Sequence, residues 1–151
     1  MAYMKVPREE GGGDASAKER EVQQAAAALE MYKQELERKL REYESLRETL
    51  NSFKNTLKAV EALEGAKTNT QLLMALGPGV YVPVKLSEKN KLVISIGSGV
   101  YAKESISQAA SKLKKSISLM EKREKELVGD IESLEKKGAE MSSRLQSMLR
   151  G

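Results

Sequence analysis

The side chains that most often carry catalysis or bind metals are missing from this chain. Its 151 residues include neither cysteine nor histidine, which removes thiol nucleophiles, imidazole bases and the commonest zinc ligands. Two glycine-rich stretches, GPGVYVPV from Gly77 and GSGVYAKE from Gly97, lack the lysine and the spacing of a phosphate-binding loop. The carboxylates fall mainly on exposed faces of predicted helices. We therefore expect no enzyme, with no catalytic residue, no metal and no cofactor.

Apolar side chains that could bind another protein gather near the two ends of the chain. Methionine is flexible and polarisable, so it suits surfaces that must adapt to many shapes. The stretch expected to face the C-terminal group, GGGDASAKER at 11–20, has no large apolar residue, so part of that group would stay uncovered. The candidate binding residues are Met4, Met141, Leu145, Met148 and Leu149. Met141, Leu145 and Met148 also fit a helical seam, which leaves that simpler interpretation open.

A strict seven-residue repeat in the first part of the chain predicts a helix over residues 16–65. Ser16 and Glu19 form a capping box, in which each side chain satisfies a free backbone N–H of the first turn. Residues 1–15, with three glycines, are expected to form a flexible lead. The a positions are Val22, Leu29, Leu36, Tyr43, Leu50 and Leu57, and the d positions are Ala25, Tyr32, Lys39, Leu46, Phe53 and Val60. Only Lys39 is polar, so the repeat favours a coiled coil.

The last part of the chain, residues 105–151, mirrors the first. Ser105 and Gln108 form a second capping box. The d positions are Ile106, Leu113, Met120, Leu127, Leu134, Met141 and Met148, and the a positions are Ala110, Ile117, Glu124, Ile131, Gly138 and Leu145. Glu124 and Gly138 are the weak positions of this seam. Two helices of matched length favour an antiparallel coiled-coil hairpin within one chain, with parallel pairing to another chain as the alternative.

Between the two helices, residues 66–104 change their apolar period from seven to two, which is the period of a strand. Glycine-rich turns at 77–79 and 97–99 predict two β-hairpins, each with one apolar face. Four short strands cannot bury that much apolar surface alone, and their open edges invite pairing with other chains. We therefore expect this segment to drive oligomerisation. A small folded cap on a monomeric hairpin is the alternative.

The order of these parts resembles the alpha-class subunit of prefoldin. The likeness spans residues from about 16 to 151, and its most telling part is the pair of hairpins with LGPGVYV and ISIGSGVY. The resemblance implies a mainly helical α+β fold and a cytoplasmic, archaeal-type, ATP-independent chaperone. Two alpha and four beta-type subunits would join through a double β-barrel, hold unfolded polypeptides at the coiled-coil tips and pass them to a group II chaperonin. A filament-forming homo-oligomer remains open.

The same resemblance implies which residues form the oligomer interface. The apolar hairpin residues that would belong to the barrel are Val80, Val82, Val84, Leu92, Ile94 and Ile96. They combine the apolar face of the second predicted strand with that of the third.

Two other classes of function compete with a chaperone. Residues 71–151 carry 14 basic and 9 acidic side chains, and a basic half can indicate nucleic-acid binding. The charges alternate in sign along the helix, however, which is more typical of a solvated face, so no nucleic-acid partner is expected. A coiled-coil scaffold or tether with one fixed partner is the other alternative. No apolar run is long enough for a membrane span, so no membrane partner is expected either.

Overall fold

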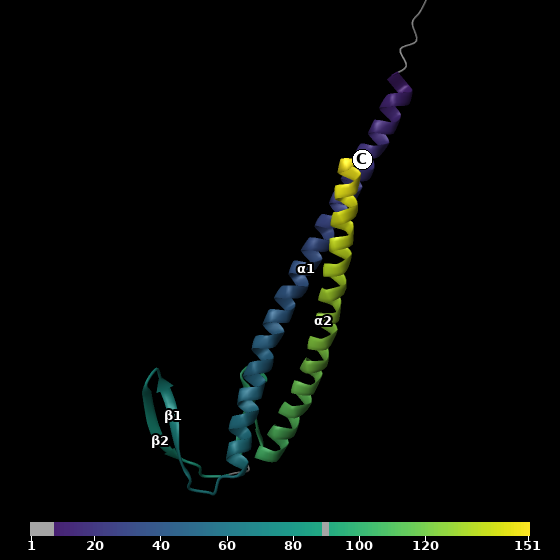
Figure 1. Cartoon of the computed structure of the whole chain (residues 1–151). Coiled ribbons are helices and arrows are strands. Elements are labelled where there is room, and N and C mark those ends of the chain that lie inside the picture. Colours follow the sequence, from purple (N-terminus) through teal and green to yellow (C-terminus); the bar gives the residue numbers. More distant parts are fainter. Residues whose placement is uncertain (1–7, 89–90) are drawn as a thin grey trace, which may run out of the picture. The chain divides into compact units, whose positions relative to one another are not determined.

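The computed structural model describes the backbone of residues 8–88 and 91–151, and the side chains from Ala15 onward within those ranges. Its elements are α1 (Arg8–Glu64), β1 (Gln71–Gly77), β2 (Val80–Lys85), β3 (Leu92–Gly97), β4 (Val100–Glu104) and α2 (Ile106–Arg150) (Figure 1). The chain divides into two compact units. We call the one that pairs residues up to Glu44 with Lys125–Gly151 the terminal unit, and the other, Ser45–Glu124, the central unit.

Within each unit, α1 and α2 run antiparallel. In the terminal unit Lys39 contacts Asp130, whereas Val22, earlier in α1, shares a groove with Met148, later in α2. In the central unit Lys54 pairs with Glu121, and Glu61 pairs with Lys114. Residues later in α1 thus pair with residues earlier in α2, which confirms the predicted antiparallel hairpin.

The seven-residue repeat is also confirmed. Every predicted a and d position of both helices is buried or half-buried. Leu127 has no exposed surface at all, and Leu29, Leu50 and Ile117 keep less than a tenth of theirs. A seam of Leu, Ile and Tyr side chains therefore holds the helices together in each unit, because burying such side chains removes apolar surface from water.

The start of α1 differs from the prediction. The helix begins at Arg8, so residues 8–15 are helical and Ser16 lies inside the helix instead of capping it. The expected flexible lead is wrong for these residues, and residues 1–7 lie outside the described part of the chain. Each glycine at 11–13 costs a helix about 1 kcal/mol relative to alanine. Extending an existing helix is nevertheless much easier than starting one, so the glycines do not end α1.

The start of α2 agrees with the prediction. The backbone N–H of Gln108 donates to Ser105 Oγ at 3.1 Å, and the backbone N–H of Ser105 donates to Gln108 Oε1 at 3.2 Å. This reciprocal pair is the expected capping box. It fixes the point at which the chain leaves β4 and enters α2.

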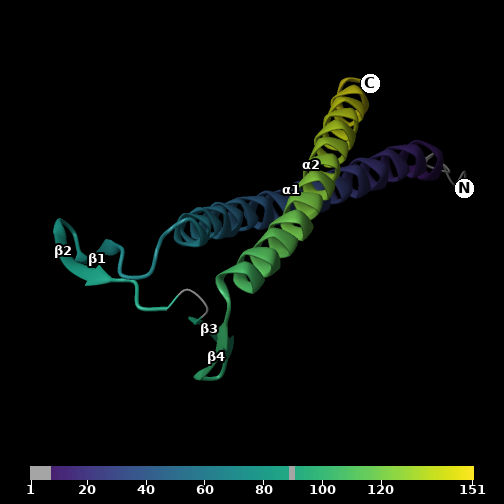
Figure 2. The same ribbon diagram turned by 90° about the horizontal axis from the view of Figure 1, so that it is seen from below.

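The middle of the chain forms two separate two-stranded antiparallel sheets, β1–β2 and β3–β4 (Figure 2). The turns after β1 and β3 contain Gly79 and Gly99 with φ of 74° and 75°, a region that glycine enters without steric cost. Both sheets change register just before the turn, between Ala75 and Gly77 and between Ser95 and Gly97. The two hairpins are therefore built alike, as their matching sequences predict.

One hairpin packs on the helices of the central unit. Val60 of α1 and Ile106, Ala109 and Ala110 of α2 form a buried cluster, and Leu92 and Ile94 of β3 pack against it together with Leu57, Leu63 and Leu113. One face of β3–β4 is thus partly covered by the chain's own helices. This contact positions the second hairpin.

Candidate binding and assembly surfaces

The β1–β2 hairpin carries apolar side chains on both of its faces. On one face, Leu72 lies opposite Val84 and Met74 lies opposite Val82; on the other, Leu73 lies opposite Pro83 and Ala75 lies opposite Tyr81. Leu73 is 68% exposed and Tyr81 is 59% exposed. The expectation of a single apolar face is therefore wrong for this hairpin. The apolar run at 72–76 already places apolar side chains on both faces of β1, because successive side chains of a strand point to opposite faces. The alternation along β2 alone did not indicate this.

The six predicted interface residues fall into three groups. Val80 and Ile96, next to the two turns, are largely exposed. Val82 and Val84 are half-buried on β2. Leu92 and Ile94 are half-buried against the helix cluster of the same chain, so their apolar surface is already partly covered without a partner. Among the six, Val80 and Ile96 therefore offer the most uncovered surface.

Sequence reasoning missed further exposed apolar residues on the second hairpin. Val93 and Tyr101 project from the face of β3–β4 opposite Leu92 and Ile94, and both keep more than three-fifths of their surface. Val100, beside the turn, is also exposed. The close match between GVYV at 79–82 and GVYA at 99–102 could have identified Tyr101 as the counterpart of Tyr81. Each of the two hairpins therefore exposes apolar side chains.

A groove lies between the two helices at the end of the terminal unit. It has a volume of about 450 Å³ and is lined by Ala15, Lys18, Glu19, Val22, Gln23, Met148 and Leu149. Leu149 is 67% exposed, while Met148 is half-buried. The α1 side of the groove offers only Val22 as a larger apolar side chain, in line with the expectation that the C-terminal residues lack a complete partner surface. We call this the end groove.

The structure brings together only some of the predicted binding residues. Met148 and Leu149 line the end groove. Met141 and Leu145 are half-buried at seam positions, and Met4 lies outside the described residues. Met141 and Leu145 are therefore placed as ordinary residues of the coiled-coil seam.

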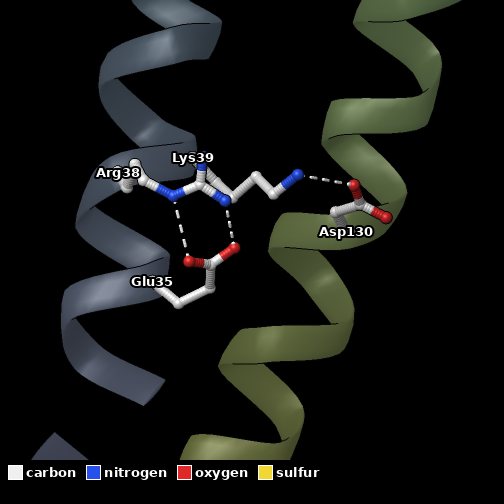
Figure 3. Close-up of polar contacts among 4 residues, drawn as sticks. All are labelled: Glu35, Arg38, Lys39 and Asp130. Carbon is white, nitrogen blue, oxygen red and sulfur yellow. Dashed lines mark hydrogen bonds and ion pairs between the residues drawn. The ribbon is translucent and has the colours of Figure 1, made fainter. Parts of the chain in front are cut away.

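The polar seam residue Lys39 has a partner across the helices. Its side chain is 16% exposed, and its Nζ lies 3.2 Å from Asp130 Oδ2 on α2 (Figure 3). Beside it, Arg38 donates from Nη2 to Glu35 Oε1 at 2.6 Å, and this hydrogen bond lowers the pKa of Glu35. The Arg38–Glu35 pair lies on one turn of α1 and is largely exposed, so it adds little to the stability of that helix.

We predict that the Lys39–Asp130 contact adds little stability. Lys39 is mostly buried, but the Asp130 side chain is 48% exposed, so water screens the pair and its contribution is small. An apolar side chain in place of Lys39 also no longer requires a charged group to be removed from water. Lys39→Leu fits the d position and should leave the urea midpoint unchanged or raise it. Asp130→Asn is the control, which keeps Lys39 in the seam without its charged partner. A clearly lower midpoint for Lys39→Leu contradicts this prediction.

Two lysines of the basic half of the chain are paired with acids. Lys112 contacts Glu104, and Lys114 lies 3.7 Å from Glu61. Such pairing favours a solvated face of mixed charge over a cationic surface for phosphates. Among the residues that the structure describes, no helix is long and apolar enough to cross a membrane. In the same residues, no group of three or more carboxylates is placed to hold a metal ion.

The sequence of the chain matches known proteins over most of its length. Residues 32–150 match the prefoldin subunit family model. The chain is 31% identical to prefoldin subunit alpha 1 of Methanocaldococcus jannaschii over 84% of this chain and 87% of that protein. It is 30% identical to prefoldin subunit alpha of Archaeoglobus fulgidus, over 77% of this chain and 85% of that one.

Solved structures show the same fold. The prefoldin beta subunit from Thermococcus strain KS-1 aligns over 87% of this chain and 94% of its own, with a TM-score of 0.58 and 21% identity. A chain of the filamentous PFD from M. jannaschii aligns over 82% and 97%, with a TM-score of 0.54 and 20% identity. Two long helices joined by hairpins, together with the match to the family model and to the archaeal relatives, identify the chain as a chaperone component: it belongs to the prefoldin subunit family, in its archaeal alpha type.

Proposed function

We propose that this subunit assembles through its hairpins with beta-type subunits and holds unfolded polypeptides at the ends of its coiled coil without ATP. The assembly is a hexamer of two alpha and four beta-type subunits in the cytoplasm, and it passes its clients to a group II chaperonin. The observation that carries the proposal is that the chain has two uncovered apolar surfaces, one on the hairpins and one at the end groove.

The hairpins support assembly because much of their apolar surface has no cover in the chain itself. Leu73, Tyr81 and Val93 each keep more than half of their surface. An isolated two-stranded hairpin is marginally stable in water, and it gains stability from further strands or a covering layer. Strand edges from neighbouring subunits supply both at once. The double β-barrel joins the hairpins in this way, with Val80 and Ile96 among the residues it covers.

The end groove supports weak and reversible holding. Burying one apolar side chain of a client contributes about 1.5–3 kcal/mol, from which the cost of ordering the client is subtracted. A single groove therefore binds weakly. When the coiled coils of several subunits bind one polypeptide, the overall affinity rises because each further contact forms at a high effective concentration. Contacts of this strength break without nucleotide hydrolysis, which suits release to a chaperonin.

We predict that Met148→Ser with Leu149→Ser weakens client holding. Removing both apolar side chains from the end groove should weaken client binding to the coiled coil of each alpha subunit by about ten-fold. This factor corresponds to a loss of about 1.4 kcal/mol of binding free energy. The loss for the hexamer is smaller because the beta-type arms are unchanged. The measurement is the hexamer concentration that halves light scattering by a client diluted from guanidinium chloride.

Met31→Ser is the matched control, because Met31 is 71% exposed on α1 and lies outside the groove. Native mass must show that both variants still form the hexamer. Unchanged suppression by the intact double variant would remove the end groove from the proposal. Transfer of a labelled client from the hexamer to a group II chaperonin tests the delivery step separately.

A further inference from the structure

The coiled-coil seam of the terminal unit contains a second hollow besides the end groove. It has a volume of about 230 Å³, and Gly138 forms part of its wall at a predicted a position. A Cβ built on Gly138 would meet no heavy atom within 4 Å, so the space is open where other seam residues place a side chain. The remaining lining residues are Leu29, Tyr32, Lys33, Leu36, Leu134, Glu135, Ala139 and Ser142. We call this hollow the seam cavity.

The size and lining of the seam cavity suit one apolar side chain. The hollow is open to solvent on one side, and its volume of about 230 Å³ leaves room for a side chain to enter. Leu29, Leu36 and Leu134 supply aliphatic walls, with Tyr32 as an aromatic neighbour. An apolar side chain entering the cavity therefore gains contacts that the empty hollow lacks.

The seam cavity and the end groove lie on the same face of α2. Gly138 and Leu149 are eleven residues apart, which is close to three full turns of an α-helix. The rise along the helix over that stretch is about 16 Å. Both hollows also lie within the terminal unit. One extended polypeptide can therefore reach both of them.

The distance between the two hollows determines how far apart in the client sequence two apolar residues must be to enter both. In an extended chain, side chains point to the same side at every second residue, with a rise of about 3.3 Å per residue. Residues i and i+4 thus lie on one side, about 13 Å apart, and residues i and i+6 about 20 Å apart. The rise of about 15 Å from Gly138 to Met148, the nearer α2 residue of the end groove, is closer to the first of these. Residues i and i+3 point to opposite sides and cannot enter both.

We propose that the seam cavity is a second anchor for unfolded polypeptides, which takes one apolar side chain while the residue four positions away occupies the end groove. The proposal rests on the proposed holding function and makes it more specific. The ligand class is an extended segment with two large apolar side chains at i and i+4.

The test uses the assembled hexamer and labelled, otherwise polar peptides. One peptide carries a single phenylalanine, a second carries two at i and i+4, and a third carries two at i and i+3. Fluorescence anisotropy measures each dissociation constant. We expect the i,i+4 peptide to bind about ten-fold tighter than the i,i+3 peptide, since that factor corresponds to burial of one further apolar side chain.

Gly138→Leu fills the seam cavity and should reduce that ten-fold ratio to about one, while the single-phenylalanine peptide loses at most about two-fold in affinity, because the end groove remains available to it. The variant should also be more stable, because leucine is a better helix former than glycine and packs in the seam. Gly129→Ala is the matched control: it lies in the same helix, also has open space around it, and lines none of the hollows described above. It should keep the ratio of ten.

The outcomes separate this inference from the proposed function. Equal binding of the i,i+4 and i,i+3 peptides to the native hexamer, with single-phenylalanine binding present, overturns the second anchor and leaves holding intact. A preserved ratio in Gly138→Leu also overturns it. Failure of all three peptides to bind overturns both the anchor and holding at the end groove.

Discussion

Ile96→Asp is expected to abolish assembly of this subunit with beta-type partners while leaving its helices folded. Ile96 lies at the end of β3, beside the turn, and is 63% exposed. Within the single chain the substitution therefore removes little packing. In the proposed barrel the same position would be covered by neighbouring strands, and an aspartate buried there without a partner would cost several kcal/mol. Because that cost falls only on the assembled state, it shifts the equilibrium strongly toward free subunits.

The measurement is native mass of the mixed subunits, with circular dichroism to check that the helix content is unchanged. Leu119→Asp is the matched control, because Leu119 is 62% exposed on α2 and does not belong to the cluster on which β3 packs. The control should assemble normally. A hexamer that survives Ile96→Asp places the interface elsewhere.

Ile94→Asp does not test the interface alone, because Ile94 already packs against the cluster of Val60, Ile106, Ala109 and Ala110 within the chain. An aspartate there disturbs the chain's own central cluster as well as any interface. Loss of assembly in that variant therefore does not locate the interface, whereas loss in Ile96→Asp does. The comparison shows why exposure in the single chain, and not apolarity alone, decides which substitution is informative.

The helices were predictable because one physical rule governs both the local conformation and the packing. Side chains seven residues apart return to the same side of a helix, so the sequence itself places Leu50 and Leu127 in the seam. The capping box at Ser105 is equally local, since its two hydrogen bonds join residues three apart. Features set by neighbours in the sequence were therefore predicted correctly.

The features that the sequence hid depend on pairing between distant segments. The register that places Leu73 beside Pro83 and Ala75 beside Tyr81 comes from the pairing of β1 with β2, although the apolar run at 72–76 alone indicates that β1 is apolar on both faces. The covered state of Leu92 depends on helices at both ends of the chain. Gly138 was recognisable as a weak seam position, but the size of its cavity depends on the side chains that α1 places opposite it.

Leu127→Ala is expected to give the largest loss of stability among single substitutions in the terminal unit. Leu127 is the one large side chain in the described residues with essentially no exposed surface. Truncating a buried leucine removes its transfer free energy and leaves a cavity, which together cost about 2–5 kcal/mol. A narrow two-helix seam has few other side chains that could move in to fill the space, so the cost should fall in the upper part of that range.

Val128→Ala is the matched control for that loss, because Val128 is the next residue of α2 and is 37% exposed. It should cost well under half as much, since less apolar surface returns to water. Urea unfolding followed by circular dichroism measures both variants. Amide hydrogen exchange adds the location: Leu127→Ala should increase exchange across the terminal unit, where α1 and α2 depend on each other for burial. Equal urea midpoints for the two variants would contradict the central role of the seam, and would mean that the helices of this unit are held together by something other than their apolar repeat.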